Sequence, residues 1–265
     1  MFFITLFPEL IAGAASVSIL GRAQKEGLIE VLCVNPRDYA TDRHRSVDDT
    51  TCGGGAGMVL RVDTYLAALE KARCLAPDAL VAALTPVGET LCQARVTALS
   101  RAGRDLIFLC GHYEGFDERI LEEADLRLSV GDFVMTGGEL PALSVMDAVA
   151  RFVPGVLGKL VSAEEDSFSG SLLEHPQYTR PISYEGKKVP DILLSGDHEK
   201  IGAWRRKKEF EATLQHRPDL FSTMTWQKGD GRLFLEMLWK TAQKIGQLQP
   251  LPGRKTSCMG FSLMV

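Results

Sequence analysis

The stretch LRLSVGDFVMTGGELPALSVMDAVARFV (Leu126–Val153) joins a strand-like run, a glycine-rich loop and an amphipathic helix. We expect the helix from about Glu139 to Val153, because its apolar residues recur at the spacing of one helical face. They are Ala142, Val145, Met146, Val149, Phe152 and Val153. Pro141 falls in the first turn, where a missing N–H is tolerated. A strand, a loop and a helix in this order predict one crossover unit of an α/β protein.

The same alternation of strands and helices is found in the residues that precede this stretch. Strand-like runs are FFITL (Phe2–Leu6), IEVLCV (Ile29–Val34), LVAAL (Leu80–Leu84) and LIFLC (Leu106–Cys110), besides LRLSV (Leu126–Val130). Helices are expected between them near 9–25, 63–75, 89–101 and 116–124. Apolar strands joined by helices predict a mostly parallel sheet covered on both faces.

The alternation of strand-like and helical segments stops after about residue 158. We expect a domain over 1–158, an acidic, Ser- and Pro-punctuated linker over 159–184, and a smaller helical domain over 185–247. Helices are predicted over 198–216 and 231–246. The tail 248–265 has no helical period and is expected to be mobile.

Composition narrows the class of protein. The 265 residues carry a formal net charge of −4, which argues against indiscriminate nucleic-acid binding but allows a local basic patch. None of the six cysteines forms a C-x-x-C pair, which favours a cytoplasmic protein without a zinc site. No run of about 18 apolar residues predicts a membrane span, and MFFITLFPEL does not resemble a signal peptide.

Glycine-rich loops follow several predicted strands. TPVG (Thr85–Gly88), CGHYEG (Cys110–Gly115) and GDFVMTGG (Gly131–Gly138) each come directly after a strand, and CGGGAGM (Cys52–Met58) is a further glycine-rich stretch. None is a nucleoside-triphosphate loop or a dinucleotide fingerprint, so a nicotinamide enzyme has no support. Loops leaving the carboxyl ends of neighbouring strands are expected to line one pocket. Each loop alone could also be an ordinary turn in which glycine supplies a positive φ.

At this point the sequence resembles a known family, the bacterial tRNA (guanine-N1)-methyltransferases of the SPOUT superfamily. The motifs that carry the resemblance run in order over roughly residues 1–217. They are TLFPEL (5–10), GRA (21–23), PRDY (36–39), DRHRSVDD (42–49), GGGAGM (53–58), CGHYEGFDERI (110–120), GDFVMTGGELP (131–141), RFVPGVLG (151–158), EDSF (165–168), HPQYTRP (175–181) and LLSGDH (193–198).

The resemblance implies a fold and a reaction. It implies a deep trefoil knot around 84–141, and S-adenosylmethionine as the donor of a methyl group to N1 of the guanosine just 3′ of the tRNA anticodon. Asp166 would be the general base and Arg151 the cation that holds negative charge on O6. Asp166 could instead belong to a solvated acidic run, and Arg151 could form a surface pair with Asp147.

The resemblance also implies the donor site. The matching positions are Leu84, Thr85, Pro86, Gly111, Tyr113, Glu114, Val130, Gly131, Asp132, Phe133, Val134, Met135, Gly137, Gly138 and Pro141. Tyr113 could also be a packed aromatic side chain, and Glu114 a helix-start acid. His112 and Ala56 depart from the family pattern, which is often Arg and Pro there, so an RNA contact by His112 and the shape of the GGGAGM loop are open.

Binding of tRNA is expected at basic side chains in both domains, namely Arg43, His44, Arg45, Arg180, His198, Arg205 and Lys208. The run Arg205–Lys208 points all round a helix, so a solvated helix is the alternative. The resemblance further implies a homodimer with the active site at the interface. The family is described as magnesium-dependent, but no dedicated metal cluster is visible in the sequence.

Three competing interpretations remain at this point. A related methyltransferase could act on another RNA position such as a ribose hydroxyl, although such an enzyme needs no carboxylate beside a guanine N1. A non-catalytic RNA-binding protein could keep the fold, against which Arg151 and Asp166 argue. A nicotinamide enzyme lacks its fingerprint.

Overall fold

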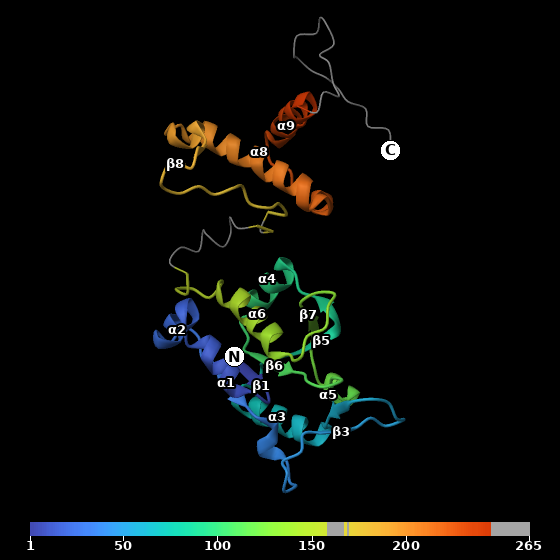
Figure 1. Cartoon of the computed structure of the whole chain (residues 1–265). Coiled ribbons are helices and arrows are strands. Elements are labelled where there is room, and N and C mark those ends of the chain that lie inside the picture. The colour runs from blue at the N-terminus through green and yellow to red at the C-terminus, as the bar shows by residue number, and fades with distance from the viewer. Residues whose placement is uncertain (158–166, 169, 245–265) are drawn as a thin grey trace, which may run out of the picture. The chain divides into compact units, whose positions relative to one another are not determined.

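The computed structural model describes residues 1–157, 167–168 and 170–244. The chain divides into two compact units, Met1–Glu164 and Glu165–Val265. Figure 1 shows an α/β first unit and a second unit dominated by helices α8 and α9. The division falls inside the segment 159–184 that the sequence predicts as a linker.

The first unit is built on a five-stranded sheet of order β2-β1-β6-β5-β7, in which every neighbouring pair is parallel. Its strands are β1 (Phe2–Ile4), β2 (Leu32–Val34), β5 (Leu80–Thr90), β6 (Leu106–Cys110) and β7 (Leu126–Ser129). The prediction of a mostly parallel sheet is confirmed. Parallel strands end at the same edge, so the loops after β6 and β7 lie together.

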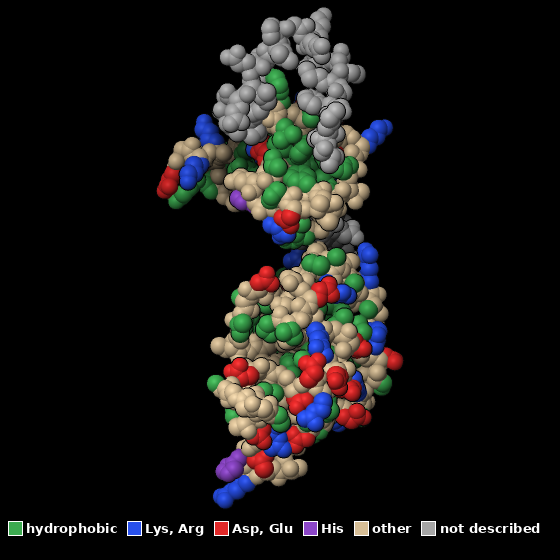
Figure 2. Space-filling model, turned by 90° about the vertical axis from the view of Figure 1, so that its right-hand side faces the viewer, with side chains coloured by type: hydrophobic (Ala, Val, Ile, Leu, Met, Phe, Trp, Pro, Cys, Tyr) green, Lys and Arg blue, Asp and Glu red, His purple; other side chains and the backbone are tan. Residues whose placement is uncertain are grey.

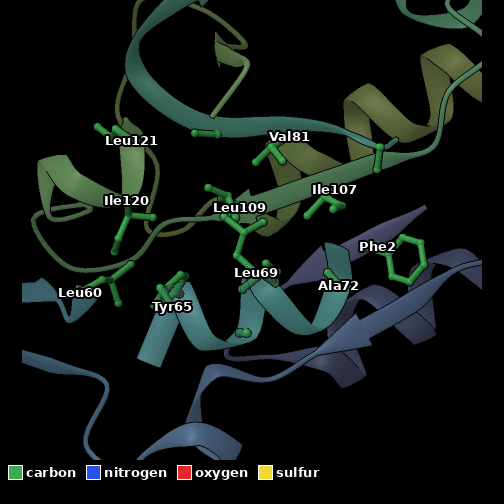
Figure 3. Packing of buried hydrophobic residues seen from close by; sticks show 14 of the residues in the cluster. Phe2, Leu60, Tyr65, Leu69, Ala72, Val81, Ile107, Leu109, Ile120 and Leu121 are labelled. Atoms are coloured by element: carbon green, nitrogen blue, oxygen red, sulfur yellow. The ribbon is translucent and has the colours of Figure 1, made fainter. Parts of the chain in front are cut away.

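Each face of this sheet carries its own apolar core. Alternate residues of β1 point to opposite faces, as in any strand: Phe2 and Ile4 pack on one side and Phe3 on the other. The first core is closed by α3 (Val62–Leu75) and α5 (Glu118–Leu121), and Figure 3 shows Tyr65, Leu69 and Ile120 meeting strand residues there.

The opposite face is covered by α1 (Pro8–Ala15), α4 (Gln93–Arg101) and α6 (Glu139–Ala150). In Figure 1, α4 and α6 lie on the other side of the sheet from α3. The predicted stripe of α6 is confirmed over Ala142, Val145, Met146 and Val149, which are all buried against the sheet. The predicted end at Val153 is wrong, because the helix ends at Ala150 and leaves Phe152 and Val153 beyond it.

One predicted helix is wrong. The segment 9–25 forms two helices, α1 and α2 (Ser18–Lys25), with a corner at Ser16 and Val17. Ser18 takes the left-handed φ of 55° at that corner. The backbone of Ser16 then lies so close to Gly21 that any Cβ at position 21 would overlap it. A continuous helix is therefore excluded by the tight turn, which the periodicity of the apolar residues does not reveal.

Strand β5 also differs from its prediction, because it continues past Leu84 to Thr90. Its pairing with β7 shifts register there: Leu128 is paired first with Leu84 and again with Glu89. The residues between form a bulge, in which a Cβ at Gly88 would lie 2.5 Å from the backbone nitrogen of Leu128. The predicted helix 89–101 consequently begins only at Gln93.

Several short elements complete the first unit. β3 (Asp48–Thr50) and β4 (Met58–Leu60) form an antiparallel hairpin with the GGGAGM loop at its tip, and η1 (Pro36–Tyr39) is a 3-10 turn. Neither hairpin strand is predicted by the sequence pattern. The Leu60 N–H donates to the Gly115 carbonyl (3.0 Å), so the hairpin is tied to the loop after β6.

The second unit consists of α8 (His198–His216), α9 (Asp230–Lys244), the hairpin β8 (Ser183–Tyr184) and β9 (Lys187–Lys188), and the turns η2 (Asp191–Leu194) and η3 (Pro218–Ser222). Leu172, Phe210, Met224 and Met237 form its small core. Trp226, Leu235 and Trp239 are largely exposed, and Figure 2 shows hydrophobic side chains gathered on the visible face of this unit. Within the described ranges, no helix is both long and apolar enough to cross a bilayer.

Candidate functional site

A cavity of about 290 Å³ opens at the carboxyl ends of β6 and β7 and beside the bulge of β5 that follows Leu84. Nearly all the residues predicted to hold a methyl donor line it: Leu84, Thr85, Pro86, Gly111, Tyr113, Glu114, Val130, Phe133, Val134, Met135, Gly137, Gly138 and Pro141. Gly131 and Asp132 belong to the same loop but not to the lining. The Gly131 carbonyl instead accepts hydrogen bonds from the Ser129 hydroxyl and the Phe133 N–H, both at 2.9 Å.

Sequence reasoning missed several residues of the lining, namely His112, Gly115, Phe116, Leu128, Ser129 and Thr136. His112, Gly115 and Thr136 sit inside motifs already singled out, so continuity of the motif was an available signal. Leu128 and Ser129 belong to β7 and pair with β5 at its bulge between Leu84 and Glu89. No local pattern could have revealed that.

Two walls of the cavity are in direct backbone contact. The Gly138 N–H donates to the Gly111 carbonyl (2.8 Å), and His112 pairs with Gly137 as an isolated bridge. A Cβ at Gly138 would lie 2.6 Å from the Gly111 nitrogen, closer than real side chains approach a backbone. The φ of Gly138 is −83°, a value open to any residue. Glycine is therefore required by the close approach of the two walls and not by its backbone conformation.

The lining is suited to a ligand without phosphates. Its residues include no lysine or arginine, and Glu114 is its one acidic side chain among the lining residues that the structure describes. The Glu114 N–H donates to the Met58 carbonyl (2.9 Å), which fixes this residue against the β3–β4 hairpin. The geometry therefore offers backbone groups, apolar contacts and one carboxylate, which suit an adenosine group and an ammonium group.

Tyr113 is held in a conformation that tyrosine rarely adopts. Its φ is 58°, in the left-handed region, and 51% of its surface is exposed. Strained residues persist only where the surroundings hold them, and they concentrate at functional sites. Tyr65 supports the same end of β6, because its hydroxyl donates to the Cys110 carbonyl (3.1 Å). Burial raises the pKa of Tyr65 and of the Cys110 thiol well above their usual values, so both stay protonated.

The two predicted catalytic residues lie away from this cavity or outside the described residues. Arg151 caps the carboxyl end of α6, whereas Gly138 and Pro141 line the cavity at the other end of the helix. At 1.5 Å per residue, the helix from Gly138 to Arg151 spans roughly 20 Å. That is longer than an arginine side chain can reach. Asp166 falls outside the described residues.

The predicted RNA contacts of the first unit form one exposed loop. Arg43, His44 and Arg45 precede β3, and the Arg45 guanidinium lies 3.8 Å from the Asp38 carboxylate. Figure 2 shows basic and acidic side chains interspersed over the visible face of this unit. The structure therefore presents a local basic loop there and not a broad basic surface.

In the second unit the basic run of α8 is mostly paired. Arg206 forms a two-pronged pair with Asp230 (3.0 and 2.6 Å), Lys207 pairs with Glu236, and Lys208 pairs with Glu211. Arg205 is exposed and forms no ion pair with the residues that the structure describes. Arg180 and His198 are exposed as well.

Exposed apolar side chains occur in the segments of the chain that line the cavity. Val87 is 75% exposed and Val134 is 83% exposed, and Phe133 and Leu140 are more than half exposed. Large apolar side chains grouped at an opening mark a surface that binds something.

Over the described ranges, no three His, Cys, Asp or Glu side chains are placed to hold a metal ion.

Comparisons with known proteins agree with this picture. The family described as tRNA (Guanine-1)-methyltransferase TrmD matches residues 1–223. A tRNA (guanine-N(1)-)-methyltransferase of Anaeromyxobacter sp. (strain K) is 50% identical over 232 residues, which cover 87% of this chain and 94% of the relative. The protein of the same name from Desulfitobacterium hafniense (strain Y51) is 52% identical over 235 residues, covering 89% of each chain. That of Desulforudis audaxviator (strain MP104C) is 48% identical over 238 residues, covering 88% and 94%.

Proposed function

Because the chain belongs to the tRNA (guanine-1)-methyltransferase family, we propose that it methylates N1 of a guanine in tRNA. The family match over residues 1–223 is the observation that carries this proposal. The target we propose is the guanosine immediately 3′ of the anticodon, as the motif resemblance implies.

The proposed methyl donor is S-adenosylmethionine, bound at the carboxyl ends of β6 and β7 and beside the bulge of β5. Support comes from the lining, which lacks the cations that a phosphate ligand needs and includes Glu114. Backbone groups near Gly111 and Gly138 can read an adenine edge, and the Glu114 carboxylate can pair with an ammonium group. When bound, this donor would supply an electrophilic methyl group.

The chemistry that the chain must add concerns the guanine. N1 of neutral guanine carries a proton, so we propose that Asp166 accepts it as the N1–methyl bond forms. Negative charge develops on O6 as that proton leaves, and we propose that the Arg151 guanidinium holds it until the N1–methyl bond is complete. A free aspartate with a pKa near 3.9 is a weak base. Stabilisation of O6 by Arg151 makes the N1 proton more acidic and so lowers this barrier.

We further propose that the active site is shared between two copies of the chain. The roughly 20 Å of helix between Gly138 and Arg151 supports this, because one chain cannot bring its own Arg151 to its own cavity along α6. The exposed apolar side chains in the segments that line the cavity support it too, because a second copy would cover them. Asp166 and Arg151 of one copy would then serve the donor site of the other.

The fold resemblance carries one more proposal, a trefoil knot around 84–141. The close passages of Gly88 against Leu128 and of Gly138 against Gly111 support it, because segments far apart in the sequence touch without room for a Cβ. We also propose that the protein works in the cytoplasm. The five cysteines among the described residues are free thiols, as expected for a reducing compartment. A magnesium requirement stays a prediction, which methylation assays with a chelator would test.

The test of the function uses full-length tRNA transcripts with guanosine or adenosine 3′ of the anticodon. We expect transfer of a labelled methyl group to the guanosine transcript, and nucleoside mass mapping should identify 1-methylguanosine. Asp166→Asn should abolish single-turnover methylation and leave donor binding, measured by calorimetry, nearly intact. A ribose-methylated product, or an Asp166→Asn enzyme with more than about a tenth of the wild-type rate, would contradict the proposal.

A further inference from the structure

Four residues at and beside the cavity wall form a closed set of contacts, which we name the Glu139 relay: Thr5, Phe7, His112 and Glu139. The Phe7 N–H donates to the Thr5 hydroxyl (2.9 Å), and that hydroxyl donates to Glu139 Oε1 (2.6 Å). His112 Nε2 lies 2.6 Å from Glu139 Oε2. The rings of Phe7 and His112 pack with centroids 4.9 Å apart, which closes the set.

The Thr5 and Glu139 side chains of the relay are buried and hydrogen-bonded, whereas His112 is partly buried and Phe7 is exposed. Thr5 is fully buried and Glu139 is 2% exposed. A buried carboxylate is costly unless hydrogen bonds compensate it. Here each carboxylate oxygen has its own partner, and Glu139 is the first residue of α6, where the helix dipole favours an acid. A completed buried network of this kind makes its surroundings rigid.

The relay joins segments that form two walls of the cavity. His112 is followed by Tyr113 and Glu114, and Glu139 is preceded by Gly137 and Gly138, all of which line the cavity. Thr5 follows β1 and adds a third attachment point from the core of the sheet. Thr5 and Glu139 are not themselves part of the lining. Their contacts can therefore act on a ligand only through the positions of the two walls.

We propose that Thr5, His112 and Glu139 are positioning residues that hold the loops after β6 and β7 at the spacing the methyl donor needs. This inference rests on the proposed function, since it concerns the donor of that reaction. Tyr113, which has a left-handed φ of 58°, is the residue that follows His112 at the cavity. Loss of the relay lets the two walls separate. This weakens binding of the donor and leaves binding of tRNA unchanged.

A pair of matched substitutions tests the relay. Thr5→Val keeps the shape of a buried side chain but removes the hydroxyl between Phe7 and Glu139. Thr64→Val is the control, because Thr64 is also buried but its hydroxyl donates to the carbonyl of Arg61, the N-cap residue of α3. With S-adenosylmethionine as the probe in calorimetry, we expect about a tenfold weaker Kd for Thr5→Val, the effect of roughly one buried hydrogen bond. Thr64→Val should bind as the wild type does.

Glu139 gives a second pair. Glu139→Ala should raise the KM for S-adenosylmethionine at least tenfold and leave the KM for tRNA unchanged. Glu139→Gln should keep most of the donor affinity, because an amide can still hydrogen-bond Thr5 and His112. If the wild type binds the donor and Thr5→Val binds it with the same Kd, the inference is overturned and the proposed function stands. Equal losses in Thr5→Val and Thr64→Val would also overturn it. A wild-type chain that neither binds the donor nor methylates tRNA would overturn the proposed function as well.

Discussion

The two units use charge in opposite ways. The cavity of the first unit is lined by glycines, apolar side chains and one acid, and the lining residues that the structure describes include no lysine or arginine. The second unit carries four consecutive basic residues, Arg205–Lys208, and three of them are held by carboxylates of the same unit. The difference shows that a cavity can be lined by glycines without a cation, while most of a basic run can be internal structure.

The same contrast provides a way to observe each unit separately. All three tryptophans, Trp204, Trp226 and Trp239, belong to the second unit. Tryptophan fluorescence therefore follows unfolding of the second unit, while circular dichroism follows both. A substitution that acts on one unit should move one signal more than the other.

The largest effect is expected for Gly138→Ala in the first unit. The new Cβ would meet the backbone of Gly111 and Cys110 at 2.6 and 2.8 Å, and neither can move without shifting β6. Overpacking of this kind should lower the free energy of unfolding by about 3 kcal/mol and abolish donor binding. Urea denaturation followed by circular dichroism measures the first, and calorimetry the second. An alanine variant that binds the donor normally would show that the two walls are not in fixed contact.

A smaller effect is expected for Asp230→Asn in the second unit. Asp230 is buried and accepts two hydrogen bonds from Arg206. Removing its charge should lower the free energy of unfolding by about 2 kcal/mol, the value of hydrogen bonds to a charged group. Asp219→Asn is the matched control, because its pair with Arg217 is exposed to solvent and should contribute nothing measurable. Equal shifts of the urea midpoint in tryptophan fluorescence would contradict the assigned role of Asp230.

Acid should weaken the second unit through the same residue. Burial acts to raise the pKa of Asp230, but hydrogen bonds from Arg206 and from the Gln227 N–H outweigh it and bring the pKa below its ordinary value. A lowered folded pKa contributes stability that is complete above the ordinary aspartate pKa of about 3.9 and is lost as the pH falls through the folded value. Urea midpoints followed by tryptophan fluorescence should therefore fall below about pH 4. They should fall less in Asp230→Asn; an identical pH dependence in both proteins would rule Asp230 out.

The smallest effect on stability, and a selective one on binding, is expected for Arg205→Ala. Arg205 is the exposed member of the basic run that makes no ion pair with the described residues, so its loss should leave the unfolding free energy unchanged. If it contacts a phosphate, tRNA binding should weaken and the salt dependence of log K should fall by about one. Lys207→Ala, which removes a lysine paired with Glu236, should keep the wild-type slope. Equal slopes for the two variants would exclude Arg205 from the RNA surface.

Much of the first unit could be predicted from local patterns. The alternation in β1 and the stripe of α6 follow directly from side-chain periods of two and 3.6 residues, so the sheet and its coverage could be recognised. The extension of β5 could not, because Pro86 and Gly88 are typical of a turn and only pairing with β7 holds them in a strand. The β3–β4 hairpin was missed for a similar reason, since Asp48 and Asp49 have low strand propensity.

Some features of the candidate site could likewise be predicted from the sequence, and others could not. The loops after LIFLC and LRLSV could be placed at one edge of the sheet, and the structure brings Gly111, Gly115, Gly137 and Gly138 together around one cavity. The expected loop Thr85–Gly88 lies inside β5 instead. The contact of His112 with Glu139 could not be predicted, because 27 residues separate them and each belongs to a different loop or helix. Pairing of the α8 cations was equally hidden, since Asp230 and Glu236 lie on another helix. Both depend on tertiary packing and not on local sequence.

The central position of β1 has a consequence for synthesis on the ribosome. Phe2, Phe3 and Ile4 are made well before their partners in β6, because Ile107, Phe108 and Leu109 lie far later in the chain. At bacterial elongation rates the partner strand emerges roughly 5–20 s later. During that interval a buried strand of the finished protein has an open, strongly apolar edge, which is a template for aggregation. Nascent chains that stall before residue 106 should therefore depend on chaperones more than chains that stall just after β6 has emerged.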